Sequence, residues 1–276
     1  MTAKLKYISF IILFILFSLT SVFAFTVEDE IDVGQEVSRQ VEKKYKVLND
    51  PGYRYRVNWV ASLLCKVCPR KDLPYTFKII DVDILNAFSL PGGFIYICRG
   101  LMDRCNDGEL AFILGHEMAH CAHSHQFHQA EKQNNTQLGL LIIGLLIPGG
   151  NLGNIAMNAL GLAGMILNNS YSRDDERQAD LDSISYMAAA GIDPRYAISA
   201  FEKMKDEGGE LPGILNGIIG THPLTDDRIA YIMKAINEIN FIPPQDSSFP
   251  PYINDSLTEE QQNSKYNEIR EKFKDN

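Results

Sequence analysis

The sequence lacks an excess of basic residues. Its 276 residues include 26 Lys and Arg against 35 Asp and Glu, which gives a net charge of −9 at pH 7. A nucleic-acid-binding surface needs clustered Lys and Arg to neutralise phosphates, and no basic stripe is visible. The same imbalance argues against attraction to anionic lipid by charge alone. We therefore expect no nucleic-acid partner.

Cysteine is also scarce, and its number is odd. The five cysteines are Cys65, Cys68, Cys98, Cys105 and Cys121. An odd number leaves at least one thiol free or paired outside the chain. Cys65 and Cys68 form a C-x-x-C pair, but there is no second pair for a zinc knuckle and no thioredoxin-like βαβ context. The sequence leaves open a disulfide that involves Cys98 or Cys105, and it assigns no pairing.

Charge is absent from a long run near the N-terminus. The run begins at Tyr7, after two lysines, and ends in small and polar residues, with Val22 and Ala24 placed as in a cleavage site. It has the length of a signal-peptide core and is short for a bilayer span. We therefore expect residues 1–24 to be a cleaved signal peptide and the protein to be periplasmic. An uncleaved membrane anchor is the alternative.

A second uncharged run, "LGLLIIGLLIPGGNLGNIAMNALGLAGMIL", covers 138–167. Its two apolar halves are separated by "PGGN", and each falls short of the roughly 20 residues that span a bilayer. We expect a hydrophobic hairpin that is buried or faces a membrane, in preference to true membrane spans. Such a hairpin could bring the protein to a membrane or to an assembly machine.

Hydrophobic periodicity predicts a mostly helical chain with one small sheet. Helices are expected at 28–48, 54–65, 107–127, 172–191, from Pro194 to about 206, and after Thr225 or Asp226. β-branched and aromatic residues predict a strand at 75–82 and two short strands within 86–98, around a Pro-Gly-Gly turn. Asn106 and Asp107 cap the helix at 107–127, and Gly191 ends the helix at 172–191. The fold class is therefore α+β, with one domain at 25–240 and a C-terminal extension at 241–276.

Histidine is scarce, yet four of the six histidines lie within 116–125, "HEMAHCAHSH". Residues four apart share a helix face, so His116 and His120 direct their imidazoles at one point. Two imidazoles at this spacing suit a tetrahedral zinc ion, and Glu117 lies close enough to act as a base without binding the metal. This is the H-E-x-x-H pattern of zinc peptidases. A surface helix with scattered histidines is the alternative.

Such a site needs a third protein ligand. Glu176 and Asp180 are four residues apart on the helix expected at 172–191. Glu176 would complete the metal site, and Asp180 would hold a ligand histidine through its other ring nitrogen. A solvated acidic face is the alternative, but the histidine pair at 116–120 favours the ligand interpretation.

At these residues the chain resembles the M48 zinc metallopeptidases, and most closely their exported bacterial branch. The resemblance rests on "NAFSLPGGFIYICRGLM", "ILGHEMAHCAHSH", "SRDDERQAD" and "THPLTDDRI", and it covers most of the mature chain. It implies a zincin-like fold, with the small sheet beside the H-E-x-x-H helix. It also implies one Zn²⁺ per chain and a role in quality control of envelope or outer-membrane proteins.

The resemblance also implies roles for individual residues. The metal ligands would be His116, His120 and Glu176, the catalytic base Glu117 and the supporting carboxylate Asp180. His222 and Arg228 match late positions that lie near the catalytic cleft in the family. His222 would either donate to the oxyanion or act as a fourth ligand that keeps the resting enzyme closed.

The remaining residues of the motif region have simpler interpretations. Cys121 is expected to be a small buried residue, and His125 to be structural. His123 and His128 are explained by exposed helical polarity. Asn86, Ala87 and Phe88 are expected to form an edge strand, to which an extended polypeptide can add through backbone hydrogen bonds.

We therefore predict an endopeptidase that hydrolyses unfolded or misassembled polypeptides. A non-cleaving chaperone or scaffold with a retained metal site is a second hypothesis, against which the presence of Glu117 argues. A structural zinc domain is a third. Structural sites are usually closed by four protein ligands, mostly Cys, whereas this one combines His and Glu with room for water.

Overall fold

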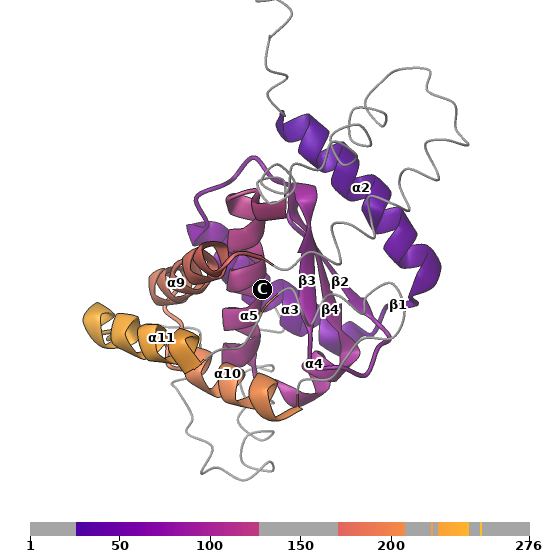
Figure 1. Ribbon diagram of the computed structural model, residues 1–276. Coiled ribbons are helices and arrows are strands. Elements are labelled where there is room, and N and C mark those ends of the chain that lie inside the picture. Colours follow the sequence, from indigo (N-terminus) through magenta and orange to yellow (C-terminus); the bar gives the residue numbers. More distant parts are fainter. Residues whose placement is uncertain (1–25, 127–170, 208–221, 223–225, 243–248, 250–276) are drawn as a thin grey trace, which may run out of the picture.

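The H-E-x-x-H helix lies at the centre of the fold. The computed structural model describes residues 26–126, 171–207, 222, 226–242 and 249. Figure 1 shows α5 (Asp107–Ala122) between a small sheet and the helices α9 (Arg173–Ala189), α10 (Tyr196–Glu207) and α11 (Asp226–Ile239). The expected signal peptide, the hairpin at 138–167 and nearly all of the C-terminal extension lie outside the described residues. Within the described part, no helix is both long and apolar enough to cross a bilayer.

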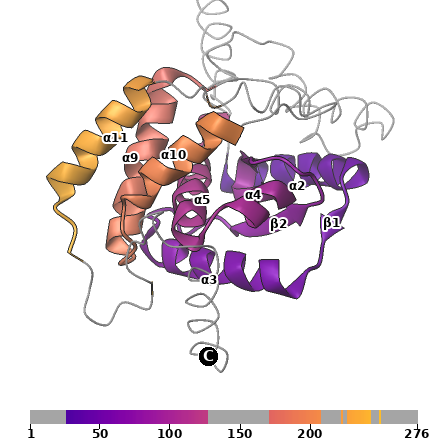
Figure 2. The same ribbon diagram turned by 90° about the horizontal axis from the view of Figure 1, so that it is seen from below.

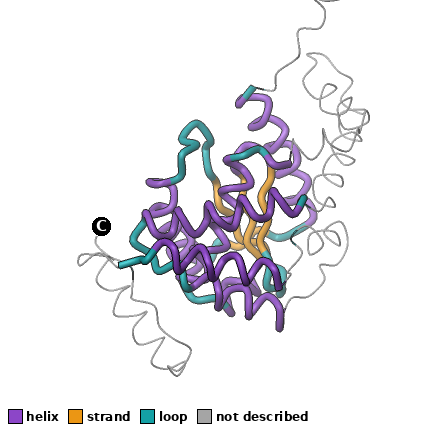
Figure 3. The backbone as a smooth tube through the Cα atoms, turned by 60° about the vertical axis from the view of Figure 1, so that its left-hand side comes forward, coloured by secondary structure: helices purple, strands orange, loops and turns teal. Residues whose placement is uncertain are grey.

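The sheet has four strands, and Figure 3 shows them as one group among the helices. Their order is β1–β2–β4–β3, so β3 is an outer strand. β4 pairs in parallel with β2 and antiparallel with β3, while β1 pairs antiparallel with β2. The bounds are Val47–Leu48 for β1, Thr76–Ile80 for β2, Ala87–Leu90 for β3 and Phe94–Cys98 for β4. The strands expected at 75–82 and within 86–98 are confirmed, and the α+β fold class with them.

Helix α2 (Val27–Lys44) packs on the turn between β3 and β4. This turn, Pro91–Gly93, has Gly92 in the left-handed region at φ 73°. A Cβ on Gly92 would lie 2.6 Å from the Cα of Ile31, and a Cβ on Gly34 would lie 1.8 Å from the carbonyl oxygen of Pro91. The two glycines therefore allow the helix and the turn to touch through their backbones.

The helix expected at 28–48 ends earlier, at Lys44. Val47 and Leu48 instead form β1 and pair with Ile80 and Ile79. Val47 is β-branched and favours a strand, and pairing with β2 gives the backbone groups of both residues hydrogen-bond partners that the last turn of a helix lacks. Helical periodicity alone could not reveal this long-range pairing.

The two faces of the sheet meet different helices. Tyr96 of β4 points toward α2, where its hydroxyl lies 2.7 Å from Glu42 Oε1. Its neighbours Ile95 and Ile97 join the core with α3 (Pro51–Val67) and α5. Figure 2 shows α2 and α3 on opposite sides of the sheet. Helix α3 begins with Asp50 as its cap and Pro51 in its first turn, three residues before the predicted start at 54.

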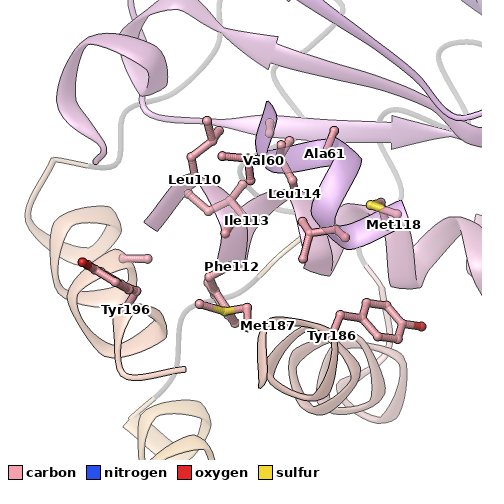
Figure 4. Packing of buried hydrophobic residues seen from close by; sticks show 14 of the residues in the cluster. Val60, Ala61, Leu110, Phe112, Ile113, Leu114, Met118, Tyr186, Met187 and Tyr196 are labelled. Carbon is pink, nitrogen blue, oxygen red and sulfur yellow. The ribbon is translucent and has the colours of Figure 1, made fainter. Parts of the chain in front are cut away.

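Helix α5 is buried along nearly its whole length, and its apolar side chains form the centre of the core (Figure 4). Asn106 caps it, with Glu109 completing the capping box. The helix ends at Ala122, short of the predicted 127, because Ser124 adopts φ 50°. Arg70 stabilises this end by donating to Cys121 O at 3.1 Å and to Ser124 Oγ at 2.6 Å.

Helix α9 packs closely against α5 at Gly115, which has no side chain. A Cβ on Gly115 would lie 2.6 Å from Ser183 Oγ, which itself donates to Phe112 O at 2.6 Å. Ser172 caps α9, and Gly191 follows its end at φ 75°, as the sequence predicts. Pro194 lies in the turn before α10. The short helix α4 (Arg99–Arg104) was not expected, and all five cysteines carry free thiols.

Candidate metal centre

Four side chains from three parts of the chain converge on one point. His116 and His120 come from α5, Glu176 from α9, and His222 from the segment before α11. One ligand atom from each lies within 4.8 Å of the others. The first three side chains are buried and His222 is half-buried. The structure thus brings together the three ligands and the late histidine that the sequence singled out.

The spacing of these atoms suits a small cation. A tetrahedral zinc ion with bonds of about 2.0–2.1 Å sets its ligand atoms roughly 3.3 Å apart. His116 Nε2 lies 3.0 Å from His120 Nε2 and 3.1 Å from His222 Nδ1. Glu176 Oε1 lies 3.4 Å from His120 Nε2 and 2.7 Å from His222 Nδ1. Because imidazole nitrogens and a carboxylate oxygen are zinc ligands, the cluster fits this metal.

Asp180 supports the cluster from behind His116. Its Oδ1 lies 2.9 Å from His116 Nδ1, a close contact whose angle does not suit a hydrogen bond, and this contact leaves Nε2 to face the cluster. Arg228 donates to Asp180 Oδ1 at 2.7 Å and lies 2.6 Å from Glu176 Oε2. The hydroxyl of Tyr231 also donates to Asp180.

Tyr231 was not found by reading the sequence. It lies three residues after Arg228, so both side chains leave one face of α11 toward the same carboxylate. A tyrosine one helical turn after a functional arginine is the signal that could have identified it.

Glu117 stands beside the cluster but outside the group of ligand atoms. Its Oε1 lies 3.5 Å from His222 Nε2. Its Oε2 is buried and has no hydrogen-bond partner among the described residues. A buried carboxylate oxygen without a partner is costly, so its retention points to a function at this position.

The charges of the cluster are arranged for a cation. Burial lowers the pKa of His120 well below its usual value, and the neighbouring His116 and His222 lower it further. Burial alone would raise the pKa of Glu176, but His222, His120 and His116 together hold it well below its usual value. Glu176 is therefore ionised and His120 neutral, as metal ligands must be.

Tyr171 forms a wall of the site that the sequence did not reveal. Its ring stacks on His120, with centroids 3.8 Å apart and planes inclined by 20°. It also lies 5.1 Å from the ring of His222. Burial raises the pKa of the Tyr171 hydroxyl well above its usual value, so the hydroxyl stays protonated and can donate.

The outer strand β3 runs along α5. The backbone N–H of Cys98 in β4 donates to the carbonyl oxygen of Asn86 at 3.0 Å. These two residues therefore face each other at a hydrogen-bonded position of the β3–β4 ladder. Because such pairs alternate, Phe88 also turns its backbone to β4, whereas Ala87 and Ser89 turn theirs to the outer edge. Of the three residues expected to meet a substrate, Ala87 has this outward register, but its N–H donates to Asn86 Oδ1 at 2.8 Å and all four residues of β3 are buried.

Comparison with known proteins gives a family match and several relatives. A model of peptidase family M48 matches residues 55–236. A putative beta-barrel assembly-enhancing protease of Vibrio cholerae is 29% identical over 216 residues, which cover 74% of this chain and 43% of that protein. The metalloprotease LoiP of Escherichia coli is 29% identical over 164 residues, covering 58% and 62%. The mitochondrial metalloendopeptidase OMA1 of Schizosaccharomyces pombe is 28% identical over 211 residues, covering 75% and 60%. The chain thus matches less than two thirds of the length of each.

Proposed function

Because the chain belongs to peptidase family M48, we propose that it is a zinc-dependent endopeptidase. The observation that carries the proposal is the position of Glu117, which is buried beside four converging ligand atoms without being one of them. A purely structural metal site has no use for a carboxylate held in this way. A peptidase needs it as a base.

The proposed metal ligands are His116, His120 and Glu176. A bound zinc ion would polarise the scissile carbonyl and lower the pKa of a water molecule to about 7. Asp180 holds the ring of His116 in place, and Arg228 holds the carboxylates of both Asp180 and Glu176. The side chains would therefore keep their positions before and after the ion binds.

Glu117 would act twice in one turnover. Its partnerless Oε2 takes a proton from the attacking water, and the same carboxyl then delivers that proton to the leaving amine. Burial beside the metal ligands excludes bulk water from this transfer. Replacing Glu117 with Gln keeps the shape of the side chain and removes the base.

For His222 we infer the role of a fourth ligand that holds the resting site closed. Its Nδ1 lies among the other ligand atoms, 2.7 Å from Glu176 Oε1 and 3.1 Å from His116 Nε2. An oxyanion donor would need to stand apart from the ligands and face the substrate. Substrate entry would then displace His222 from the position it occupies here.

The outer edge of β3 is the proposed substrate-binding surface. An extended polypeptide that pairs with Ser89 and with the carbonyl of Ala87, whose N–H donates to Asn86 Oδ1, would run beside α5, on which His116 and Glu117 lie. Pairing of this kind reads the backbone more than the side chains. It therefore suits unfolded polypeptides of varied sequence.

We further propose that the substrates are unfolded or misassembled proteins of the cell envelope. Two features support this: the expected signal peptide at 1–24, and the similarity to beta-barrel assembly-enhancing proteases. On this proposal the enzyme is periplasmic, and the apolar segment at 138–167 brings it to a membrane or to an assembly machine.

The proposal is tested by comparing zinc-loaded wild type with Glu117→Gln on an unfolded protein. We expect the wild type to cleave it and the variant to lose at least about 10²-fold in kcat, with one zinc bound to each. Equal cleavage by both would assign the activity to another base or to a contaminant. Zinc binding without cleavage by either protein would favour a non-cleaving scaffold.

A further inference from the structure

Two histidines of the motif region, His123 and His125, lie outside the ligand group. The end of α5 determines where they point. Ser124 adopts φ 50°, and Arg70 donates to its hydroxyl at 2.6 Å, which turns the chain back against the helix. A left-handed serine is uncommon and often marks a functional position. The turn places His125 beside the proposed ligand His120.

The contact between these two rings joins their Nδ1 atoms. His120 Nδ1 lies 2.9 Å from His125 Nδ1. His120 is fully buried and His125 is 2% exposed, so water has little access to this bond. Because Nε2 of His120 faces the ligand group, its lone pair is needed there and the proton must sit on Nδ1. His120 therefore donates, and His125 Nδ1 accepts.

Donor and acceptor roles are consistent in each further bond, going outward from His120. His125 Nε2 must then carry its proton, and it lies 3.2 Å from Gln178 Oε1, which can only accept. The amide nitrogen of Gln178 lies 3.3 Å from His123 Nδ1, which accepts from it. His123 Nε2 in turn lies 2.6 Å from Asp182 Oδ2. Each group thus donates in one direction only.

We propose that His125, Gln178, His123 and Asp182 form a directed hydrogen-bond chain that holds His120 as the Nδ1–H tautomer, with Nε2 ready for the metal. They are positioning residues, since none of them lies in the ligand group. The inference rests on the proposed zinc site and deepens it. This hydrogen-bond chain would orient His120 as Asp180 orients His116. The difference is that the carboxylate of Asp182 reaches His120 through three intervening side chains instead of contacting it directly.

The contributions should fall with distance from His120. The inner bond is buried, whereas Gln178 is exposed and His123 and Asp182 are about one-third exposed. Water can replace a partner at the exposed positions but not at the inner one. His125 is therefore expected to contribute most, Gln178 less, and His123 least.

The test measures the zinc affinity of the purified chain by competition with a chromogenic chelator. We expect His125→Ala to bind zinc 10- to 100-fold more weakly than wild type, as loss of a group that orients a ligand does. Ser185→Ala is the matched control, because Ser185 is an exposed residue of α9, as Gln178 is, but its hydroxyl donates to Leu181 O away from the proposed ligands; this variant should bind zinc like wild type.

A pair of variants at Gln178 tests the direction of the chain. Gln178→Glu still accepts from His125 but cannot donate to His123, so zinc affinity should stay close to that of wild type. Gln178→Leu removes the nearer acceptor of His125 Nε2, leaving Asp175 Oδ1 at 3.9 Å, and should weaken binding by less than His125→Ala. A larger loss with Glu than with Leu would contradict the proposed polarity.

A spectroscopic readout separates positioning from a general structural role. In the zinc-loaded wild type, nitrogen-15 NMR should show a slowly exchanging proton on His120 Nδ1, and His125→Ala should make this proton exchange fast. Melting of the metal-free proteins serves as the folding control, and His125→Gln replaces the alanine variant if the latter does not fold.

The outcomes for this inference and for the proposed function are distinguishable. Wild-type zinc affinity and a slowly exchanging His120 proton in a folded His125 variant would overturn the inference and leave the zinc peptidase intact. Failure of wild type and Glu117→Gln alike to bind zinc would overturn the proposed function itself.

Discussion

Asp180 of α9 contacts site residues of both α5 and α11. It accepts from Arg228 and Tyr231, it lies 2.9 Å from His116 Nδ1, and it is fully buried. Burial would raise its pKa, but His116 and Arg228 lower the pKa below its usual value, so it stays ionised. The carboxylate therefore links the metal ligands of α5 and α9 to α11.

The first prediction concerns Asp180→Asn. The variant leaves the buried Arg228 with one anionic partner fewer, and breaking a buried pair costs about 3–5 kcal/mol at most, because Glu176 remains beside Arg228. Zinc affinity should fall 10- to 100-fold, since Asn keeps an oxygen beside His116 Nδ1 but loses the negative charge that holds this ring. Chemical unfolding and chelator competition measure the two effects. Unchanged zinc affinity would show that Asp180 does not support zinc binding.

The second prediction concerns His222→Ala. If His222 is a fourth ligand of the resting site, its removal weakens zinc binding and increases the rate of cleavage, because the position for substrate is open from the start. If it stabilises the oxyanion instead, kcat falls by about 10²–10³-fold. Steady-state kinetics on an unfolded protein, with zinc in excess, distinguishes the two roles.

The residues of the site differ in how far the sequence reveals them. His116, His120 and Glu117 stand out because helical spacing fixes their relation, and Glu176 follows from the need for a third ligand. Tyr171, Tyr231 and Gln178 do not, since each contacts the site across a long sequence separation. His125 was interpreted as structural because nothing local shows that the chain turns back at Ser124.

At the scale of elements, local signals predicted the starts of helices better than their ends. The capping residues Asn106 and Ser172 mark the starts of α5 and α9, and both make capping boxes in the structure. The end of α5 depends on Arg70, fifty residues away, and the end of α2 on pairing with β2. Long-range contacts of this kind leave no periodic trace in the sequence.

The third prediction concerns the contact between α2 and the β3–β4 turn. Gly92→Ala should destabilise the fold by more than about 1 kcal/mol, because the residue has φ 73° and its Cβ would lie 2.6 Å from the Cα of Ile31. Gly52→Ala is the matched control. Gly52 lies in α3 without a positive φ, and its Cβ would lie 3.1 Å from Asp50 Oδ1, a side-chain atom that must shift by only a few tenths of an ångström. Thermal unfolding of both variants should show a loss at Gly92 alone.

At the scale of the molecule, the folded unit begins before the region that matches the family. The match starts at residue 55, yet α2 at Val27–Lys44 contacts the sheet and the β3–β4 turn. Arg70 pairs with Glu30 of α2 and also holds the end of α5. The N-terminal helix is therefore coupled to the H-E-x-x-H helix.

The fourth prediction concerns removal of the metal. Zinc that binds only the folded state raises its stability by about 2.7 kcal/mol when present at 100 times its Kd. Treatment with a chelator should therefore lower the melting temperature of the wild type. The melting temperature of Glu176→Gln should respond much less, because that variant lacks a ligand. Equal shifts in the two proteins would place the bound metal elsewhere.

The central claim is that His116, His120 and Glu176 hold one zinc ion beside the base Glu117. Native mass spectrometry of the purified chain tests it most directly, because it counts metal ions on intact molecules. We predict one zinc per chain in the wild type and in Glu117→Gln, and none in a variant that combines His120→Ala with Glu176→Gln. A wild type without zinc, or a double variant that retains it, would contradict the assignment.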